Sequence, residues 1–248
     1  MASSSQSLCI PIFVGQGTNA ANSTTTRRQA LSDALLPSCS VLLAACFQAF
    51  TSELSTLSSS FLDDIYVNLS EFATKESLLM QQDEHYLYNP VITGPTLFLM
   101  QVLRYLAFAE EGTKPHESFS NILKSNKKHG VGILGFSSGI LPACVVGSSN
   151  SVIEFISRAV EAFRLTLWIG IRSQLYRKKT LSLCTSSVQP SLPWSLVFFG
   201  LNRQAAEAAL EKFNKVIKWQ SFLIMEWVNF ISHVGIRKCP ALLDGGIG

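Results

Sequence analysis

Residues 129–149 read HGVGILGFSSGILPACVVGSS, and the prediction of the fold begins from them. The apolar run VGILGF predicts a strand, and SSGILPACVVGSS predicts a helix. The residues at the junction fit the pattern Gly-x-Ser-x-Gly, with Ser137 at its centre. This pattern is typical of a nucleophile elbow, but an ordinary strand–turn–helix looks the same in sequence. The remainder of the chain must decide between the two.

In a nucleophile elbow, Ser137 would occupy a strained turn that projects its hydroxyl into a cleft. The backbone N–H of Ser138 and the dipole of the following helix would favour a developing oxyanion there. Five residues with three fixed positions recur by chance, so the motif alone is weak. The strand before it and the helix after it are the context that the elbow requires.

The composition excludes several function classes. Of the 248 residues, 47% are hydrophobic and 15% are charged, which is typical of a globular chain with a sizeable core. The formal charge of +3 is small and the basic residues are scattered, so we expect no nucleic-acid partner. The apolar segment 35–50 is interrupted and shorter than the ~20 residues of a membrane span. With no secretory signal visible, we expect a cytoplasmic protein without a membrane partner.

The six cysteines show no C-x-x-C pair and no metal-ligand spacing. We therefore expect no metal site. Cys39, Cys46 and Cys144 lie among apolar neighbours, which predicts buried free thiols. Such thiols indicate a reducing compartment.

The pattern of apolar residues predicts the order of the elements. We expect a strand at 9–17, a helix at 24–36 with a Thr cap, helical structure at 40–58, a largely buried helix at 89–111 with Pro95 in its first turn, a long amphipathic helix at 151–179, a Ser- and Pro-rich linker at 180–193, and a strand–turn–helix unit at 194–215.

Five of these segments, in this order, resemble one known family. They are IFVGQGT (12–18), NPVITGPTLFLMQVLRYLAF (89–108), GILGFSSGILPACVV (132–146), AVEAFRLTLWIGIRSQ (159–174) and LPWSLVFFGLNRQAAEAALEKFN (192–214). Together they resemble the starter-unit acyltransferase domain of fungal non-reducing polyketide synthases. The likeness covers roughly residues 10 to 214. The first-strand Gly-Gln-Gly and the central Gly-x-Ser-x-Gly meet in one cleft in that fold.

The resemblance implies an α/β fold with three parts. Residues 1–190 would form an acyltransferase core, similar to the α/β hydrolases, with a parallel sheet and flanking helices. Residues 191–215 would begin a small ferredoxin-like α+β subdomain, and residues 216–248 form a divergent tail. The similarity ends near Val216, which predicts a chain truncated on its C-terminal side.

The implied activity is acyl transfer in two steps. An acyl group would move from acyl-CoA to Ser137 and then to the phosphopantetheine thiol of an acyl carrier protein. No bound cofactor is expected. The acyl carrier protein and the ketosynthase domains of a polyketide synthase are the implied partners.

The resemblance also assigns roles to single residues. Ser137 is the nucleophile, although many members carry Cys there, and Ser138 N–H and Gln16 would form the oxyanion hole. Malonyl-specific relatives hold the substrate carboxylate with an Arg of the helix after the elbow, for which Arg164 is the candidate. A starter acyl group without a carboxylate needs no such Arg. The family's general base is a His well downstream of the nucleophile, so His233, the one histidine after Ser137, is the candidate base, and it lies in the divergent tail.

Two other functions stay open. If His233 is not the base, Ser137 keeps a high pKa and the chain is a catalytically silent remnant or a binding module. An α/β serine hydrolase is the weaker alternative, because it needs an acid and a His after the serine and gives the first-strand Gly-Gln-Gly no role.

Overall fold

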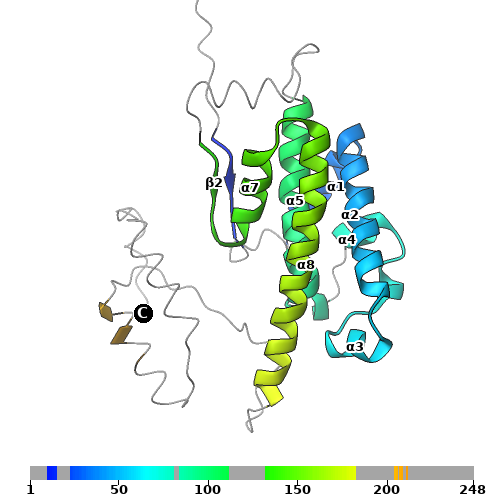
Figure 1. Cartoon of the computed structure of the whole chain (residues 1–248), viewed down its shortest axis with the longest axis vertical. Coiled ribbons are helices and arrows are strands. Elements are labelled where there is room, and N and C mark those ends of the chain that lie inside the picture. The colour runs from blue at the N-terminus through cyan, green and yellow to red at the C-terminus, as the bar shows by residue number, and fades with distance from the viewer. Residues whose placement is uncertain are drawn as a thin grey trace, which may run out of the picture. The chain divides into compact units, whose positions relative to one another are not determined.

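A parallel two-stranded sheet joins the start of the chain to the strand of the elbow motif. In this computed structural model, β1 (Ile12–Phe13) pairs with β2 (Leu134–Gly135), with Phe13 opposite Gly135. The Phe136 amide donates to the Phe13 carbonyl at 2.9 Å. Parallel strands need a long crossover connection, and helices form part of this one (Figure 1).

The structure describes residues 10–15, 23–80, 84–111 and 132–182, together with the helical residues 204–205, 207–208 and 211. The chain divides into two compact units, Met1–Trp194 and Ser195–Gly248. The described part of the first unit is mostly helical with one small parallel sheet, which is compatible with the predicted α/β class. The expected subdomain at 191–215 and tail at 216–248 lie almost wholly outside the described residues and stay predictions.

The described residues form the helices predicted near 24–36, 40–58, 89–111, 137–149 and 151–179, together with shorter ones. They are α1 (Thr24–Asp33), α2 (Pro37–Ser55), α3 (Ser59–Asp64), α4 (Lys75–Met80), α5 (Pro90–Glu111), α7 (Ile140–Ser148) and α8 (Val152–Ser182), with the 3-10 helices η3 (Leu69–Glu71), η4 (Glu84–Tyr86) and η5 (Ser137–Gly139).

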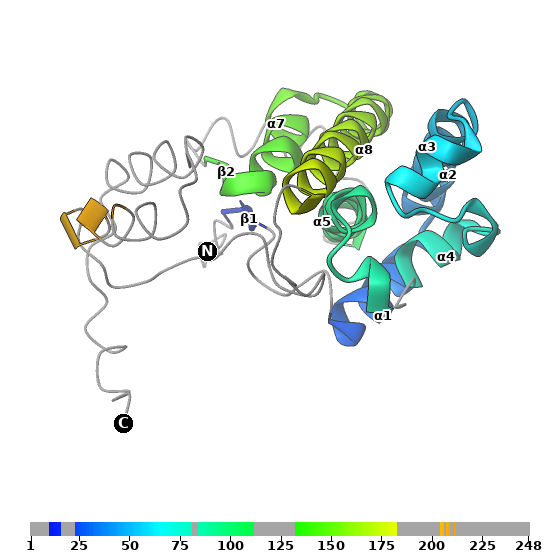
Figure 2. The same cartoon turned by 90° about the horizontal axis from the view of Figure 1, so that it is seen from below.

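Helices α5 and α8 form the centre of the first unit. Tyr105, late in α5, stacks on Phe155, early in α8, with 5.9 Å between ring centroids. At the other end, Gly170 of α8 packs against the carbonyl group of Pro90, the first residue of α5. The two helices therefore run antiparallel, and they lie side by side in Figures 1 and 2.

The core lies around this helix pair. The sheet and α7 are on one side of α5 and α8, and α2 is on the other (Figure 2). Residues spaced four apart along α8 form a fully buried apolar stripe. They are Phe155, Ala159, Phe163, Leu167 and Ile171.

Helix α5 confirms the predicted buried helix at 89–111. By length and composition alone it could cross a membrane, but 72% of its most apolar window is buried against the rest of the chain. Hydrophobic residues that surround a helix in this way are typical of the core helix of a folded domain. Its apolar character is therefore explained by packing.

Two predicted helix starts are wrong in detail. Helix α1 is capped by Ser23, whose Oγ accepts from the Thr26 amide at 3.3 Å, and not by a Thr. Helix α5 begins at Pro90, so Pro95 lies inside it and not in its first turn. Proline at the first position removes an amide that has no helical partner anyway, so Pro90 suits this place.

The cysteine prediction holds for two residues and fails for a third. Cys39 and Cys46 are fully buried free thiols, as predicted. Cys144 is exposed, because α7 turns Pro142, Val145 and Val146 toward the core and leaves Cys144 on the other face. An apolar neighbourhood in sequence did not fix which face of the helix was buried.

Candidate functional site

Ser137 lies at the sharp turn between β2 and α7, with an unusual backbone. Phe136 is still extended, with φ −116° and ψ 127°, whereas Ser137 has φ 57°. Positive φ is uncommon for a residue with a side chain and is kept where the surrounding structure holds it. The chain then enters η5 and α7 directly. Strand, strained turn and helix are the geometry of a nucleophile elbow, so the strand–turn–helix prediction is confirmed.

The two glycines of Gly-x-Ser-x-Gly allow this turn to pack tightly. A Cβ on Gly135 would lie 2.5 Å from the Gly139 carbonyl oxygen and 2.6 Å from Cα of Ile140. A Cβ on Gly139 would overlap the Phe13 carbonyl of β1. Neither position has room for a side chain, so the motif is required by the close approach of β1, β2 and α7.

The first-strand motif meets the serine. A Cβ on Gly15 would lie 2.6 Å from Cβ and 3.0 Å from Oγ of Ser137. The segment that leaves β1 thus passes directly over the nucleophile position. Gln16, the next residue, lies outside the described residues, so its expected part in an oxyanion hole stays a prediction.

Ser138 is the second residue of η5, the helical segment that continues into α7. The first amides of a helix have no partner within the helix and carry its partial positive charge. Ser137 itself is half-buried. The Oγ of Ser138 is buried and has no hydrogen-bond partner among the described residues. An acyl oxygen held beside Ser137 would therefore face the start of a helix, which favours negative charge.

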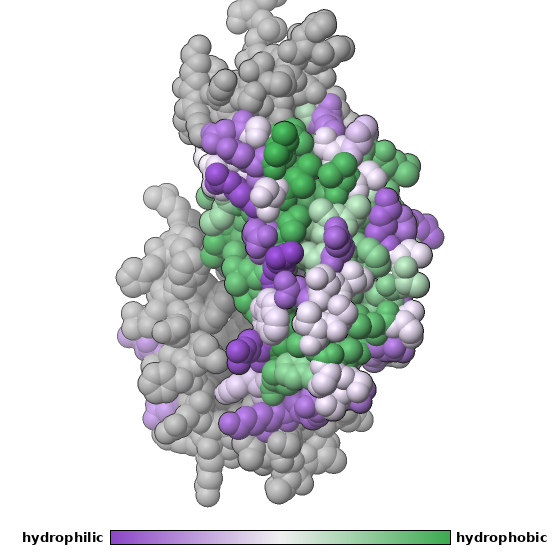
Figure 3. All heavy atoms as spheres, turned by 45° about the vertical axis from the view of Figure 1, so that its right-hand side comes forward, coloured by the Kyte–Doolittle hydropathy of each residue, from purple (hydrophilic) through white to green (hydrophobic). Residues whose placement is uncertain are grey.

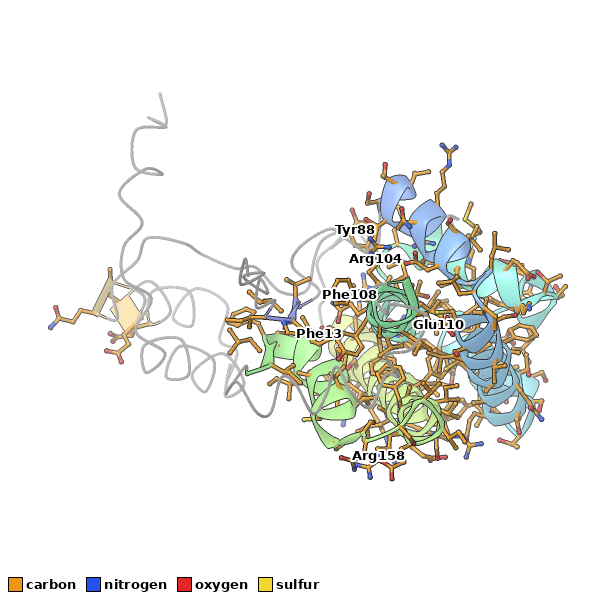
Figure 4. The ribbon with its side chains drawn as sticks, turned by 90° about the horizontal axis from the view of Figure 1, so that it is seen from above. Phe13, Tyr88, Arg104, Phe108, Glu110 and Arg158 are labelled. Atoms are coloured by element: carbon orange, nitrogen blue, oxygen red, sulfur yellow. The ribbon has the colours of Figure 1, made fainter. Side chains whose placement is uncertain are left out.

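The structure does not bring Arg164 to Ser137. Its Nε lies 3.6 Å from a Glu53 carboxylate oxygen of α2, and Nη1 lies 3.8 Å from Glu161. Helix α2 is on the opposite side of the α5–α8 pair from the sheet (Figure 2). Arg158, the next Arg toward the start of α8, pairs with Glu154 at 3.9 Å and lies at the outer edge of the molecule (Figure 4). A carboxylate-binding role for Arg164 has no support from this placement.

The four histidines of the chain fall largely outside the described residues. His85 is exposed in η4 and its ring lies 3.7 Å from that of Tyr86, centroid to centroid. His116, His129 and His233 belong to segments that the structure does not describe. The part of the chain that is described contains no cluster of His, Cys, Asp or Glu that could hold a metal ion.

An apolar groove of about 420 Å³ lies elsewhere, between α2 and α8. Val41, Ala45, Ile153, Ile156 and Val160 line it. On the face shown in Figure 3, hydrophobic side chains form patches that polar side chains separate. None of the lining residues belongs to β1, β2 or η5, so the groove is separate from the Ser137 site.

Sequence reasoning missed one residue of the site, Gln101 of α5. Its Nε2 donates to the Val14 carbonyl, immediately before Gly15, at 2.7 Å. The signal in the sequence was a single amide side chain in the apolar run TLFLMQVL. Such a residue within a buried helix needs a hydrogen-bond partner.

Comparison with known proteins decides the family. The family model described as "Starter unit:ACP transacylase in aflatoxin biosynthesis" matches residues 22–222. The chain belongs to this transacylase family. Ser137, Ser138 and Arg164 lie inside the match, and β1 and Gly15 precede it.

Curated relatives of the transacylase chain are much longer proteins. It is 49% identical over 240 residues to orsellinic acid synthase ArmB of Armillaria ostoyae, covering 96% of this chain and 11% of that protein. It is 33% identical over 208 residues to an orsellinic acid synthase of Beauveria bassiana, covering 82% and 9%. It is 22% identical over 168 residues to fatty acid synthase beta subunit TOXC of Cochliobolus carbonum, covering 65% and 8%. The chain therefore spans about a tenth of the length of these relatives.

The Armillaria alignment covers 96% of the chain, so it extends beyond residue 222, where the family match ends. No solved structure matches the transacylase chain.

Proposed function

We propose that this chain transfers a starter acyl group from acyl-CoA to an acyl carrier protein of a polyketide synthase, through an ester on Ser137. The observation that carries the proposal is the placement of Ser137. It sits at positive φ between a parallel strand and a helix, with Gly15 packed against its side chain, within the family match. The finer fold, an acyltransferase core followed by a ferredoxin-like subdomain, is part of the same proposal.

The reaction has two balanced steps. Ser137 Oγ attacks the thioester carbonyl and gives up its proton to a base, which passes it to the sulfur as the C–S bond breaks and CoA leaves as a thiol. The phosphopantetheine thiol of the carrier protein then gives its proton to the base and attacks the acyl-serine, and the base passes that proton to Oγ as the ester C–O bond breaks. In both steps the carbonyl oxygen becomes negative, and the helix start at Ser138 and the backbone near Gln16 would stabilise it.

The substrate class follows from the surroundings of Arg164. In the described structure its guanidinium lies against Glu53 and Glu161, so it does not point a cation at Ser137. We therefore propose an acyl group without a carboxylate. The protein itself is proposed to bind no metal and no cofactor, with acyl-CoA acting as a substrate.

His233 is the proposed base, since it is the one histidine that follows Ser137 in the sequence. General bases contribute about 10²–10⁴-fold to such reactions. If another residue, or none, takes this role, the chain is the silent remnant or binding module considered above.

The proposed partners are the carrier and ketosynthase domains of a synthase. Two relatives are named orsellinic acid synthases, and the chain covers 11% and 9% of their lengths. A domain of that size would work next to the other domains of the synthase. We propose a cytoplasmic location, where acyl-CoA is available.

Acylation with radiolabelled acetyl-CoA tests the proposal. We expect the purified chain to form a labelled acyl-enzyme that Ser137→Ala abolishes. His233→Ala should slow labelling by about 10²-fold if His233 is the base. Ser148→Ala, at the far end of α7, is the matched control and should label as the wild type does. Equal labelling of wild type and Ser137→Ala would place the acyl group on another residue and contradict the ester on Ser137, and no labelling of either chain would favour the silent remnant.

A further inference from the structure

Gln101 stands out because it connects the core helix to the catalytic turn. Helix α5 is apolar over most of its length, and the neighbours of Gln101, Met100 and Val102, are buried. Gln101 is half-buried, and its Nε2 donates to the Val14 carbonyl at 2.7 Å. The contact joins residues 87 positions apart.

The hydrogen bond from Gln101 binds the first residue after the end of the sheet. Phe13 is the last residue of β1, and its carbonyl accepts from the Phe136 amide of β2. One residue later, the Val14 carbonyl accepts from the Gln101 side chain. The next residue, Gly15, has its Cα against Ser137. Gln101 therefore fixes the first peptide after the strand, directly before the chain crosses the serine.

The same face of α5 holds β1 one turn further on. Tyr105 lies four residues after Gln101, and its ring packs on Phe13 of β1 at 6.0 Å between centroids. Figure 4 shows Phe13 on β1 beside α5. Phe155 of α8 also packs on the Tyr105 ring. The amide of Gln101 is thus carried by a helix that is packed against both β1 and α8.

We propose that Gln101 is a positioning residue for the acyl-transfer site. It holds the Val14–Gly15 peptide against Ser137, so that the backbone after β1 is in place to stabilise the acyl oxygen. This inference rests on the proposed function. Oxyanion donors act within narrow distances, and removing one lowers the rate by about 10²–10³-fold. We therefore expect displacement of the Val14–Gly15 segment to lower the acylation rate.

The test compares two isosteric changes on the same helix. Gln101→Met keeps the length of the side chain and removes the donor. Thr96→Val is the matched control, since Thr96 Oγ1 donates to the Leu78 carbonyl at 3.3 Å and Leu78 lies in α4, away from the elbow. Single-turnover acylation by acetyl-CoA is measured over a range of concentrations, with thermal unfolding of each variant as a check on folding.

For Gln101→Met we expect the acylation rate at saturating acetyl-CoA to fall about 30-fold, with the half-saturating concentration unchanged. Thr96→Val should change the rate less than threefold at a similar loss of melting temperature. Gln101→Glu should behave like Gln101→Met, because a carboxylate cannot donate to the Val14 carbonyl. Equal rate losses in Gln101→Met and Thr96→Val, or no loss in either, would overturn the positioning role.

A second readout separates this inference from the proposed function. The amide resonance of Gly15, in a sample labelled with ¹⁵N-glycine, should shift or broaden in Gln101→Met and stay unchanged in Thr96→Val. If wild type forms no acyl-enzyme, the proposed function fails, and the Gly15 resonance still decides whether Gln101 holds this segment. An unchanged resonance in Gln101→Met overturns the inference.

Discussion

At the scale of single residues, the elbow depends on glycines, because a side chain at these positions would not fit. Ser137 keeps φ at 57° because the backbone around it is packed too closely to relax. Gly139 touches the Phe13 carbonyl, and Gly15 touches the serine side chain. Three segments meet at one point only because two of them contribute no side chain there.

Gly139→Ala should therefore damage the elbow. Its Cβ would overlap the Phe13 carbonyl, and backbone cannot move aside as a flexible side chain does. We expect a loss of about 3 kcal/mol in the free energy of unfolding, measured by urea denaturation. Gly132→Ala is the control, because nothing lies within 4 Å of a Cβ at that position. A Gly139→Ala variant as stable as Gly132→Ala would contradict the close approach of β1.

At the scale of elements, the α5–α8 pair sets the geometry of the site. Gly170 lets α8 approach the first carbonyl of α5, and the Tyr105–Phe155 stack closes the other end. Between these ends, α5 presents Gln101 to the segment after β1. Helix α5 is thus packed against α8 along its length and contacts the segment after β1 through Gln101.

Gly170→Ala should push the two helices apart. The new Cβ would lie 2.8 Å from the Pro90 carbonyl carbon, and we expect a net loss of about 2 kcal/mol in the free energy of unfolding. Gly147→Ala in α7 is the matched control. There the nearest atom, Cδ1 of Ile133, is at 3.8 Å, so alanine should stabilise the helix by about 0.5 kcal/mol. Chemical denaturation measures the free energy of unfolding of both variants. A change of the same sign in the two variants would contradict this helix contact.

At the scale of the whole molecule, burial links stability to pH. Burial raises the pKa of the Tyr105 hydroxyl from about 10 to about 12. It also raises the pKa of the Cys46 thiol. In both cases the folded chain disfavours the ionised form. The contribution of each group to the free energy of unfolding is therefore complete below its pKa in the unfolded chain. It is lost as the pH rises through its pKa in the folded chain.

We therefore expect alkaline destabilisation that depends on Tyr105. Between pH 9 and pH 12 the wild type should lose about 2 kcal/mol more of its unfolding free energy than Tyr105→Phe does. The Phe ring keeps the packing on Phe13 and Phe155 while removing the ionisable group. Tyr176→Phe, at an exposed position, is the control and should follow the wild type. Urea denaturation at each pH measures these values, and parallel curves for all three chains would contradict the prediction.

Whatever depends on local pattern could be predicted from the sequence. The apolar run before Ser137 and the small residues after it predicted β2 and α7, because strands and helices have fixed periodicities. The buried α5 and the long α8 follow from the same rule. Boundaries were less accurate, since Ser23 and not a Thr caps α1, and α8 continues to Ser182, past the predicted end at 179.

The order of the elements, the elbow motif and the likeness to the transacylase family are all present in the local pattern of residues. The contacts of Gly15 with Ser137, of Gln101 with Val14 and of Arg164 with Glu53, and the outward position of Cys144, follow from the packing of distant segments. Local spacing says which residues share a face of a helix. Which neighbour that face meets depends on how α5, α8 and the two strands pack, and that packing joins residues too far apart in the chain for any local pattern to connect.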